Sequence, residues 1–411
     1  MTPSGALPPV ALYVHVPFCV SHCPYCDFVV VAGRKARGPA NRIEAFAAAL
    51  EVELRLRAEA LDARWGPPGL RPPLETLYLG GGTPSLLPAA TILRLIRLIG
   101  ERFGLAPVAE VTLEVNPGAD ERGDAAAQRD AGVTRLSIGA QSLDAAELRT
   151  LGRRHSPEDV AETVRAARAA GLRSLSVDLL YDVPGSTVQR WSRTLDDALA
   201  LEPDHVSMYA LTLDDPDAEG LTGSGGDHLP VTPGARRWRE RARAGQDDDR
   251  AAEMYALADR RLAAAGFEWY EISNWARPGH RSRHNLAYWE GRSYEAAGPG
   301  AHAFDGLARR WNAARLDGYL AALVPHDGGE PRLPPGSREP SARNDADRGS
   351  EAAILALRMS SGLPVAALEQ PLLRPALTWA IEARLLERQL DRLVLTRSGR
   401  LLSNEVFVRL I

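Results

Sequence analysis

Six short apolar runs recur in the first half of the chain, separated by stretches of helix-forming residues. The runs cover residues 11–16, 74–79, 110–115, 133–138, 174–180 and 205–211. Ala, Leu, Arg and Glu dominate the segments 42–63, 91–103 and 157–170 between them, which predicts helices there. Strand and helix alternating at this spacing favour βα units around a parallel sheet. Six units are enough for a partial, open barrel, whereas a closed barrel needs eight.

Glycines and polar residues follow these predicted strands, at the ends where parallel sheets carry their chemistry. Three cysteines come after the first run, Gly80–Gly82 after the second, Glu114 at the end of the third, Gln141 after the fourth and Asp178 near the end of the fifth. Since the interior of a parallel strand is normally apolar, such groups need hydrogen-bond partners or a ligand. We therefore expect a binding site along one edge of the sheet.

The pattern changes after residue 212 and predicts five segments in all. Residues 1–212 form the barrel with the cysteine loop, and residues 213–247, rich in Asp, Gly, Pro and Arg, are an inserted loop. Residues 248–324 complete the core and carry an aromatic-rich segment, and the polar residues 325–349 are a flexible linker. Helices followed by a hairpin near 393–402 predict a winged-helix-like α+β appendage over 350–411.

Charge and composition exclude several classes of protein. The 49 basic and 53 acidic residues give a net charge of −4, which argues against nucleic acid as a partner. Lys35 is the single lysine, so a Walker-type phosphate loop is excluded and lysine Schiff-base chemistry is disfavoured. No apolar stretch is long enough for an integral membrane segment and none resembles a signal peptide, so we expect a cytoplasmic protein.

The three cysteines of the 411-residue chain lie within eight residues, as Cys19-x3-Cys23-x2-Cys26. A four-iron cluster takes one thiolate per iron, so three thiolates leave one iron open to an exchangeable ligand. A structural zinc ion normally takes four protein ligands. Two alternatives stay open: a zinc site that recruits His15 or His22, and three buried thiols with no metal.

The spacing Cys-x3-Cys-x2-Cys in a loop after the first strand resembles the radical S-adenosylmethionine (SAM) superfamily. This resemblance implies a [4Fe–4S] cluster whose open iron binds the amino and carboxylate groups of SAM. It also implies an electron donor, such as flavodoxin or ferredoxin, and reductive cleavage of SAM to methionine and a 5′-deoxyadenosyl radical. The difficult chemistry then belongs to the cofactor, and the protein orients and shields it.

One branch of this superfamily is similar over most of the chain. Segments 12–19, 80–85, 113–118, 135–142, 151–155 and 178–185 resemble the oxygen-independent coproporphyrinogen III oxidase family. The resemblance implies that SAM is contacted by Tyr13, Gly81, Gly82, Thr83, Glu114, Gln141, Arg153 and Asp178. His155, which follows Arg153 closely, is expected at the surface or at a helix start.

Two departures direct the resemblance toward the haem chaperone (HemW) group of this family. Phe28 stands where the oxidases carry a fourth cysteine, and only 18 residues precede Cys19. In the haem chaperone group the motif His-Asn-x-x-Tyr-Trp, here His284, Asn285, Tyr288 and Trp289, is associated with haem binding. His302 is a second candidate, because a neutral imidazole is a good axial ligand for iron. A buried, hydrogen-bonded structural histidine is the alternative role for either residue.

Three hypotheses follow from the sequence. The first is a haem chaperone that carries a cluster with exchangeable SAM, binds haem as cargo and passes it to an acceptor protein. The second is a coproporphyrinogen oxidase that decarboxylates two propionate side chains. The third is a zinc-stabilised, non-catalytic binding module.

Overall fold

The computed structural model describes residues 5–33, 42–213, 216–325, 328–342 and 345–411. Its centre is a parallel sheet in which six strands follow one another in sequence order. These strands are β1 (Ala11–Val16), β4 (Leu74–Gly81), β5 (Leu105–Val115), β6 (Arg135–Gln141), β7 (Ser174–Tyr181) and β8 (His205–Ala210). Each coincides with one of the six predicted apolar runs, so the predicted βα architecture is confirmed.

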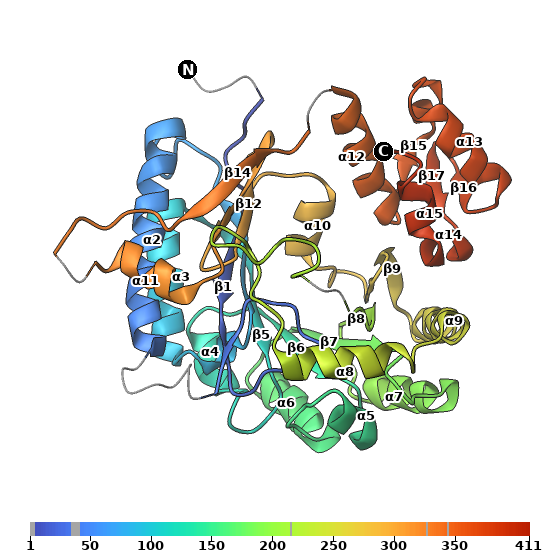
Figure 1. Ribbon diagram of the computed structural model, residues 1–411, viewed down its shortest axis with the longest axis horizontal. Helices are drawn as coiled ribbons and strands as arrows, with labels where there is room; N and C mark the ends of the chain where they lie inside the picture. The colour runs from blue at the N-terminus through green and yellow to red at the C-terminus, as the bar shows by residue number, and fades with distance from the viewer. Residues whose placement is uncertain (1–4, 34–41, 214–215, 326–327, 343–344) are drawn as a thin grey trace.

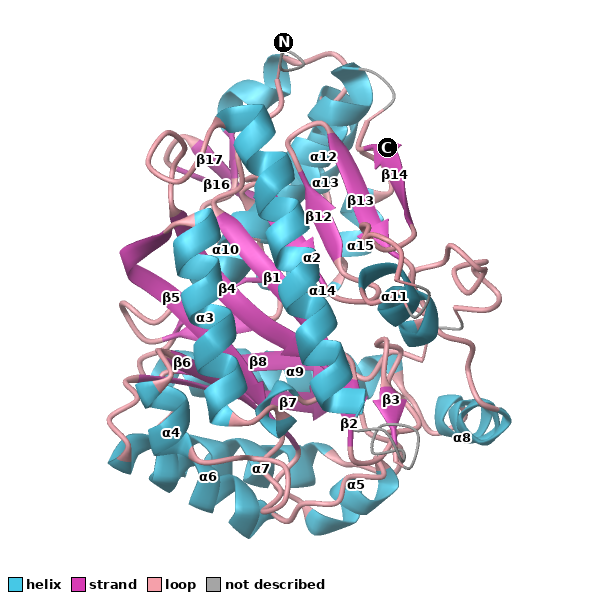
Figure 2. Ribbon diagram, turned by 90° about the vertical axis from the view of Figure 1, so that its left-hand side faces the viewer, coloured by secondary structure: helices cyan, strands magenta, loops and turns pink. Residues whose placement is uncertain are grey.

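Helices cover the outer face of this sheet and enclose the main hydrophobic core (Figure 2). They are α2 (Arg42–Trp65), α3 (Ala89–Phe103), α4 (Ala125–Asp130), α5 (Ala145–Thr150), α6 (Pro157–Ala169) and α7 (Val188–Ala200). Side-chain caps start several of them: Ser156 forms a capping box with Asp159, and Thr187 accepts from the backbone N–H of Arg190. With the helices on the outside, the carboxyl ends of the strands remain free to build a site.

Shorter strands extend the sheet at both ends. β11 (Tyr294–Ala297) lies parallel to β1 as a seventh parallel strand, which the sequence pattern did not predict. The antiparallel strands β12 (His302–Phe304), β13 (Ala308–Asn312) and β14 (Gly336–Pro340) follow it. At the far end, β10 (Asn274–Ala276) and β9 (Glu268–Glu271) pair beyond β8. The predicted linker 325–349 therefore contributes β14 to the sheet.

The predicted inserted loop 213–247 contains an ordered helix, α8 (Pro233–Arg243), just before α9 (Asp248–Ala264). Thr232 caps α8 and Pro233 occupies its first turn, where a missing N–H costs nothing. Ala235, Arg239 and Ala242 form its buried face. This helix was not predicted from the sequence, because its buried face is composed of alanine and arginine rather than of large apolar residues.

A smaller unit with its own hydrophobic core ends the chain, at the upper right of Figure 1. It comprises α12 (Asp345–Arg358), β15 (Leu363–Pro364), the 3-10 turn Val365–Glu369, α13 (Arg374–Glu382), β16 (Leu386–Gln389), β17 (Arg392–Leu395), α14 (Arg397–Leu401) and α15 (Ser403–Phe407). The hairpin is β16–β17, so the position predicted at 393–402 is wrong except for residues 393–395, which end β17. Thr396 caps α14 there and turns the chain into a helix.

Two further helices are α10 (Arg283–Trp289), which lies against β4, and α11 (Leu316–Leu323), which packs against helix α2. No helix among the described residues is both long and apolar enough to cross a membrane.

Candidate functional site

A cavity of about 400 Å³ opens at the carboxyl ends of the parallel strands. All three cysteines line it, together with six of the eight residues expected to contact SAM: Gly81, Gly82, Glu114, Gln141, Arg153 and Asp178. The strand ends thus bring to one place residues that are up to 160 positions apart in the sequence.

The cysteine loop follows β1 through the short parallel pair β2 (Phe18–Cys19) and β3 (Val31–Ala32). The backbone N–H of Cys26 donates to the carbonyl of Cys23, which turns the loop, and all three thiols are free and half-buried. Burial raises the pKa of Cys19 to about 12, although a hydrogen bond with Thr83 acts in the opposite direction. Burial also raises the pKa of Cys26, so a cationic centre is needed to hold these two sulfurs as thiolates.

The donor set fits an iron–sulfur cluster better than a single ion. Within the described ranges, no three His, Cys, Asp or Glu side chains are gathered tightly enough to hold one metal ion. His15, one proposed fourth ligand for zinc, is engaged elsewhere: Tyr13 Oη lies 3.0 Å from its Nδ1, and the Val29 carbonyl lies 2.8 Å from its Nε2. Three thiols that line one cavity suit a cubane, which takes one thiolate at each of three separate irons.

A chain of polar side chains joins two of the cysteines across the strand ends. Thr83 Oγ1 lies 3.3 Å from Cys19 Sγ and accepts a 2.9 Å hydrogen bond from Asn116. Arg153 donates to Asn116 Oδ1 at 2.5 Å and to Cys23 Sγ at 3.5 Å. Thr83 therefore contacts the cysteine loop, and Asn116 joins the site although no specific role was predicted for it. Its position two residues after Glu114 was the available signal.

Glu114 sits beneath the glycine turn that ends β4. Its carboxylate accepts 2.8 Å hydrogen bonds from Tyr78 Oη and from the backbone N–H of Gly81. Burial raises the pKa of Glu114 to about 7, despite these two hydrogen bonds. Gly81 has a φ of +109°, and a Cβ on Gly82 would lie 2.7 Å from the Phe18 carbonyl oxygen. Only glycines allow the backbone to pass this closely under the cysteine loop.

Gln141 and Asp178 complete the polar wall. Gln141 has a φ of +67° at a β-bulge in the β6–β7 pairing, an uncommon conformation that aims its side chain back over Gly139. Asp178 accepts from Ser137 at 2.8 Å and from Ser176 at 2.9 Å, while burial raises the pKa of its carboxyl. His155 lies at a helix start, as expected, because it directly precedes Ser156, the N-cap of α6. It is buried there rather than at the surface, and its Nε2 lies 3.0 Å from the Ala140 carbonyl oxygen.

Arg239 on α8 is a residue of the site that the sequence did not reveal. Its guanidinium donates to the backbone carbonyls of Pro24, Tyr25 and Cys26 at 3.0–3.3 Å. Its side chain is buried, so α8 fastens the cysteine loop from outside the barrel. An arginine in a polar segment carries no sequence signal for such a role.

The haem candidates are distributed over different parts of the structure. His284 is 1% exposed, and both ring nitrogens are engaged, Nδ1 with Thr76 Oγ1 at 2.8 Å and Nε2 with Tyr288 Oη at 2.7 Å. Burial lowers the pKa of His284 to about 3. Asn285 lines the cavity of the cysteines. The histidine of this motif is therefore part of the core, where each of its ring nitrogens already has a hydrogen-bond partner.

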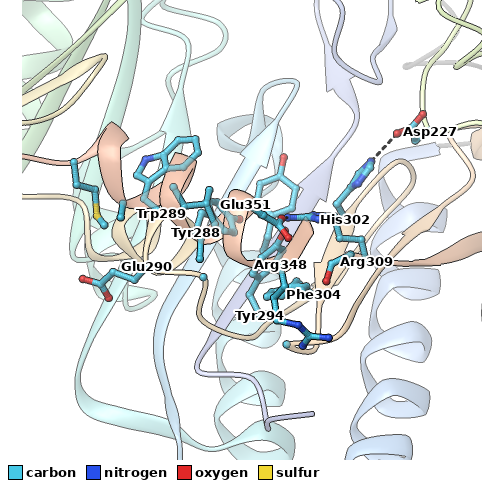
Figure 3. A pocket seen from close by; sticks show the side chains of 18 of the residues that line it. Asp227, Tyr288, Trp289, Glu290, Tyr294, His302, Phe304, Arg309, Arg348 and Glu351 are labelled. Carbon is cyan, nitrogen blue, oxygen red and sulfur yellow. Dashed lines mark hydrogen bonds and ion pairs between the residues drawn. The ribbon is translucent and has the colours of Figure 1, made fainter. Parts of the chain in front are cut away.

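Tyr288, Trp289 and His302 line a second, larger cavity of about 890 Å³, between the sheet edge and the C-terminal unit (Figure 3). Tyr13 lines this cavity and not the first, although it lies close to Glu114: a Cβ on Gly80 would be 3.0 Å from the Tyr13 ring and 3.1 Å from Glu114 Oε1. Asp27 and Phe28 border both cavities, directly after Cys26. The two cavities thus share the end of the cysteine loop as a common wall.

Comparison with known proteins agrees with this geometry. The Radical SAM superfamily model matches residues 13–198, and the HemN C-terminal domain model matches residues 344–402. A Mycobacterium tuberculosis protein named heme chaperone HemW is 38% identical over 97% of this chain and 94% of its own length. The chain belongs to the HemW family of radical SAM proteins.

An Escherichia coli HemW is 34% identical over 72% of this chain and 70% of its own length. The solved structure of E. coli coproporphyrinogen III oxidase (HemN), described as a radical SAM enzyme, superposes with a TM-score of 0.77. It is 22% identical and covers 98% of this chain and 90% of that chain. This chain and HemN therefore share one fold, including the C-terminal unit.

Proposed function

We propose that this protein is a cytosolic haem chaperone that holds a [4Fe–4S] cluster with exchangeable SAM and transfers haem to an acceptor protein. The full-length similarity to proteins named heme chaperone supports this proposal. The observation that carries it is the second cavity, large enough for a planar macrocycle and walled by aromatic side chains beside the cysteine loop. Three free thiols suit the reducing cytosol.

In this proposal Cys19, Cys23 and Cys26 would hold the [4Fe–4S] cluster and leave one iron open to SAM. When bound, this cofactor pair supplies one-electron chemistry, for which flavodoxin or ferredoxin is the expected donor class. Arg153, anchored on Asn116, is placed to pair with a carboxylate.

Acidic and amide side chains on the opposite strand ends complete the nucleotide pocket. Glu114 and Asp178 offer acceptors for ribose hydroxyls, and Gln141 offers an amide. The Gly81–Gly82 edge lets the ligand approach the backbone. Tyr13 lines the other cavity, so we assign it a supporting role through His15.

The test combines metal analysis with haem titration of anaerobically reconstituted protein. The expected result is about four irons per chain together with a Soret band that saturates at one haem. One zinc and no iron would instead support the zinc-stabilised binding module.

An activity assay separates the chaperone from the oxidase. The reconstituted protein is supplied with coproporphyrinogen, SAM and a reductant. We expect no decarboxylated product, because Phe28 stands where the oxidases carry a fourth cysteine. Steady turnover of coproporphyrinogen would overturn the chaperone proposal, whereas transfer of bound haem to an apo-acceptor protein would support it.

A further inference from the structure

The antiparallel hairpin β12–β13 presents a set of side chains that neither the cluster site nor the His284 motif uses. His302 pairs across the hairpin with Trp311, and Phe304 pairs with Arg309. Because side chains two residues apart in a strand share a face, these four lie on one face of the hairpin. Three of them, His302, Phe304 and Arg309, line the 890 Å³ cavity (Figure 3).

His302 is held in the manner of a metal-ligating histidine. Its Nε2 lies 2.8 Å from Asp227 Oδ2, and its ring stacks on Trp311 at 5.5 Å and 18°. A carboxylate on one ring nitrogen fixes the tautomer and raises the basicity of the other nitrogen, here Nδ1. The side chain is 41% exposed to the cavity and solvent, in contrast to His284, whose two nitrogens are both occupied within the core.

The rest of the cavity suits a flat aromatic ligand that carries carboxylates. Tyr288, Tyr294 and Phe304 provide aromatic walls, with ring centroids 4.5 Å apart for the first pair and 6.2 Å for the second. Arg309 and Arg348 provide guanidinium groups, which pair well with carboxylates. Arg309 also contacts Glu351, whereas Arg348 makes no ion pair within the described part of the chain.

We propose that haem binds in this cavity with His302 Nδ1 as its axial ligand, Asp227 orienting that imidazole, and Arg348 and Arg309 receiving the propionates. The inference rests on the proposed haem-binding function and specifies its site. It assigns the His284 motif a different task, namely building the wall that carries Tyr288 and Trp289. It also places the cargo between the barrel and α12, next to the end of the cysteine loop.

Hemin titration of the reconstituted full-length protein tests the axial ligand. His302→Ala should weaken hemin binding at least tenfold, about 1.4 kcal/mol, and shift the Soret band. Added imidazole should restore the wild-type band, which a folding defect would not allow. The control is His280→Ala, a histidine outside both cavities, which should leave the titration unchanged.

The outcomes separate the inference from the function on which it rests. If wild-type protein binds no hemin, the proposed function fails. If wild type binds hemin and His302→Ala binds with the same affinity and spectrum, the function stands and the site is wrong. His228 lines the same cavity and contacts Asp227 Oδ1 at 3.0 Å, so it is the competing ligand. If the Soret band changes in His228→Ala and not in His302→Ala, the assignment of His302 as the axial ligand is wrong.

The propionate contacts are tested with a modified cargo. Arg348→Glu should weaken hemin binding about tenfold, and the charge-matched control Arg241→Glu on exposed α8 surface should not. Hemin dimethyl ester, which lacks the carboxylates, should bind both variants equally. An equal loss of hemin and ester affinity in Arg348→Glu would contradict the propionate assignment.

Discussion

Each of the three cysteines has a different polar neighbour. Cys19 contacts the Thr83 hydroxyl, Cys23 accepts from Arg153, and the backbone of Phe28 hydrogen-bonds Cys26. Such contacts tune the electron density on sulfur and orient the thiolate. Each sulfur is thus positioned separately, and the chain has no fourth cysteine to replace one that is lost.

Cys26→Ser should abolish the cluster after anaerobic reconstitution, because one iron loses its thiolate. Iron and sulfide analysis and visible absorption give the measurement. Ser21→Ala, in the same loop and the same cavity, is the control and should retain about four irons per chain. A full cluster in Cys26→Ser would contradict the ligand assignment.

The buried carboxyl of Glu114 should make stability depend on pH in a definite direction. Its pKa is about 7 in the folded chain and 4.5 ordinarily, so folding takes up a proton between these values. The free energy of unfolding therefore falls as the pH rises through this window, by up to about 3 kcal/mol. A glutamine at this position stays neutral at every pH, so the free energy of unfolding of Glu114→Gln should lack this pH-dependent decrease.

Urea unfolding of ligand-free wild type and Glu114→Gln at pH values between 4.5 and 8 measures the effect. The unfolding free energy of wild type minus that of the variant should become more negative as the pH rises. A pH-independent difference would mean that Glu114 is already ionised in the fold.

The residue types at the strand ends were predictable from the sequence, whereas their partners were not. Glu114 and Asp178 stand out because carboxylates rarely end buried strands. The partner of His284 Nδ1 is Thr76 in β4, which is more than 200 residues away in the sequence. Periodicity gives the position of a side chain in its own element and says nothing about neighbours brought close by the fold.

Among the elements, α8 is an insertion that supports the cysteine loop although none of its residues lines the cavity of the cysteines. Trp238 packs against Tyr25 with ring centroids 6.5 Å apart and donates to the Thr150 carbonyl. Arg239, the next residue, reaches the carbonyls of the cysteine loop. These contacts replace the loop's hydrogen bonds to water and fix its backbone before any cofactor binds.

Arg239→Met should loosen the cysteine loop while retaining a similar side-chain length. Three backbone carbonyls lose a charged donor, so we expect the cluster to release iron several times faster to a chelator. Arg237→Met, on the exposed side of the same helix, is the matched control. Equal rates of iron release for the two variants would show that α8 does not hold the loop.

Long, apolar elements were predictable, whereas short or charged ones were not. Runs of apolar residues predict the six barrel strands, and a run of helix-forming residues predicts α2. β12, β13 and β14 have three to five residues each, and each depends on the edge of the strand before it, beginning with β12 on β11. Strand pairing of this kind is a property of the assembled sheet.

For the molecule as a whole, a buried carboxylate joins the C-terminal unit to the barrel. Asp259 on α9 receives two hydrogen bonds from Arg400 at 2.9 and 3.0 Å, and one each from Arg397 and Trp275. Burial alone would raise the pKa of Asp259, but these arginines hold it below its ordinary value. Because residues of both units line the larger cavity, we expect this contact to influence the cavity's shape.

Asp259→Asn should destabilise this docking by about 3 kcal/mol, because two arginines lose their counter-charge. Thermal unfolding should then occur at lower temperature, and hemin affinity should fall. Asp196→Asn, which breaks an exposed pair with Arg261, should cost less than about 1 kcal/mol. In wild type the contribution of Asp259 is complete above pH ~3.8 and is lost as the pH falls through its folded pKa. Equal stability of the two variants would contradict this role.

The gathering of every thiol of the chain in one cavity has a practical consequence. A maleimide or iodoacetamide reagent finds no cysteine elsewhere on the surface, so each alkylated sulfur reports directly on the loop. Mass spectrometry of quenched samples would count zero to three adducts per chain, and so would follow cofactor assembly or loss in a mixture without any optical signal.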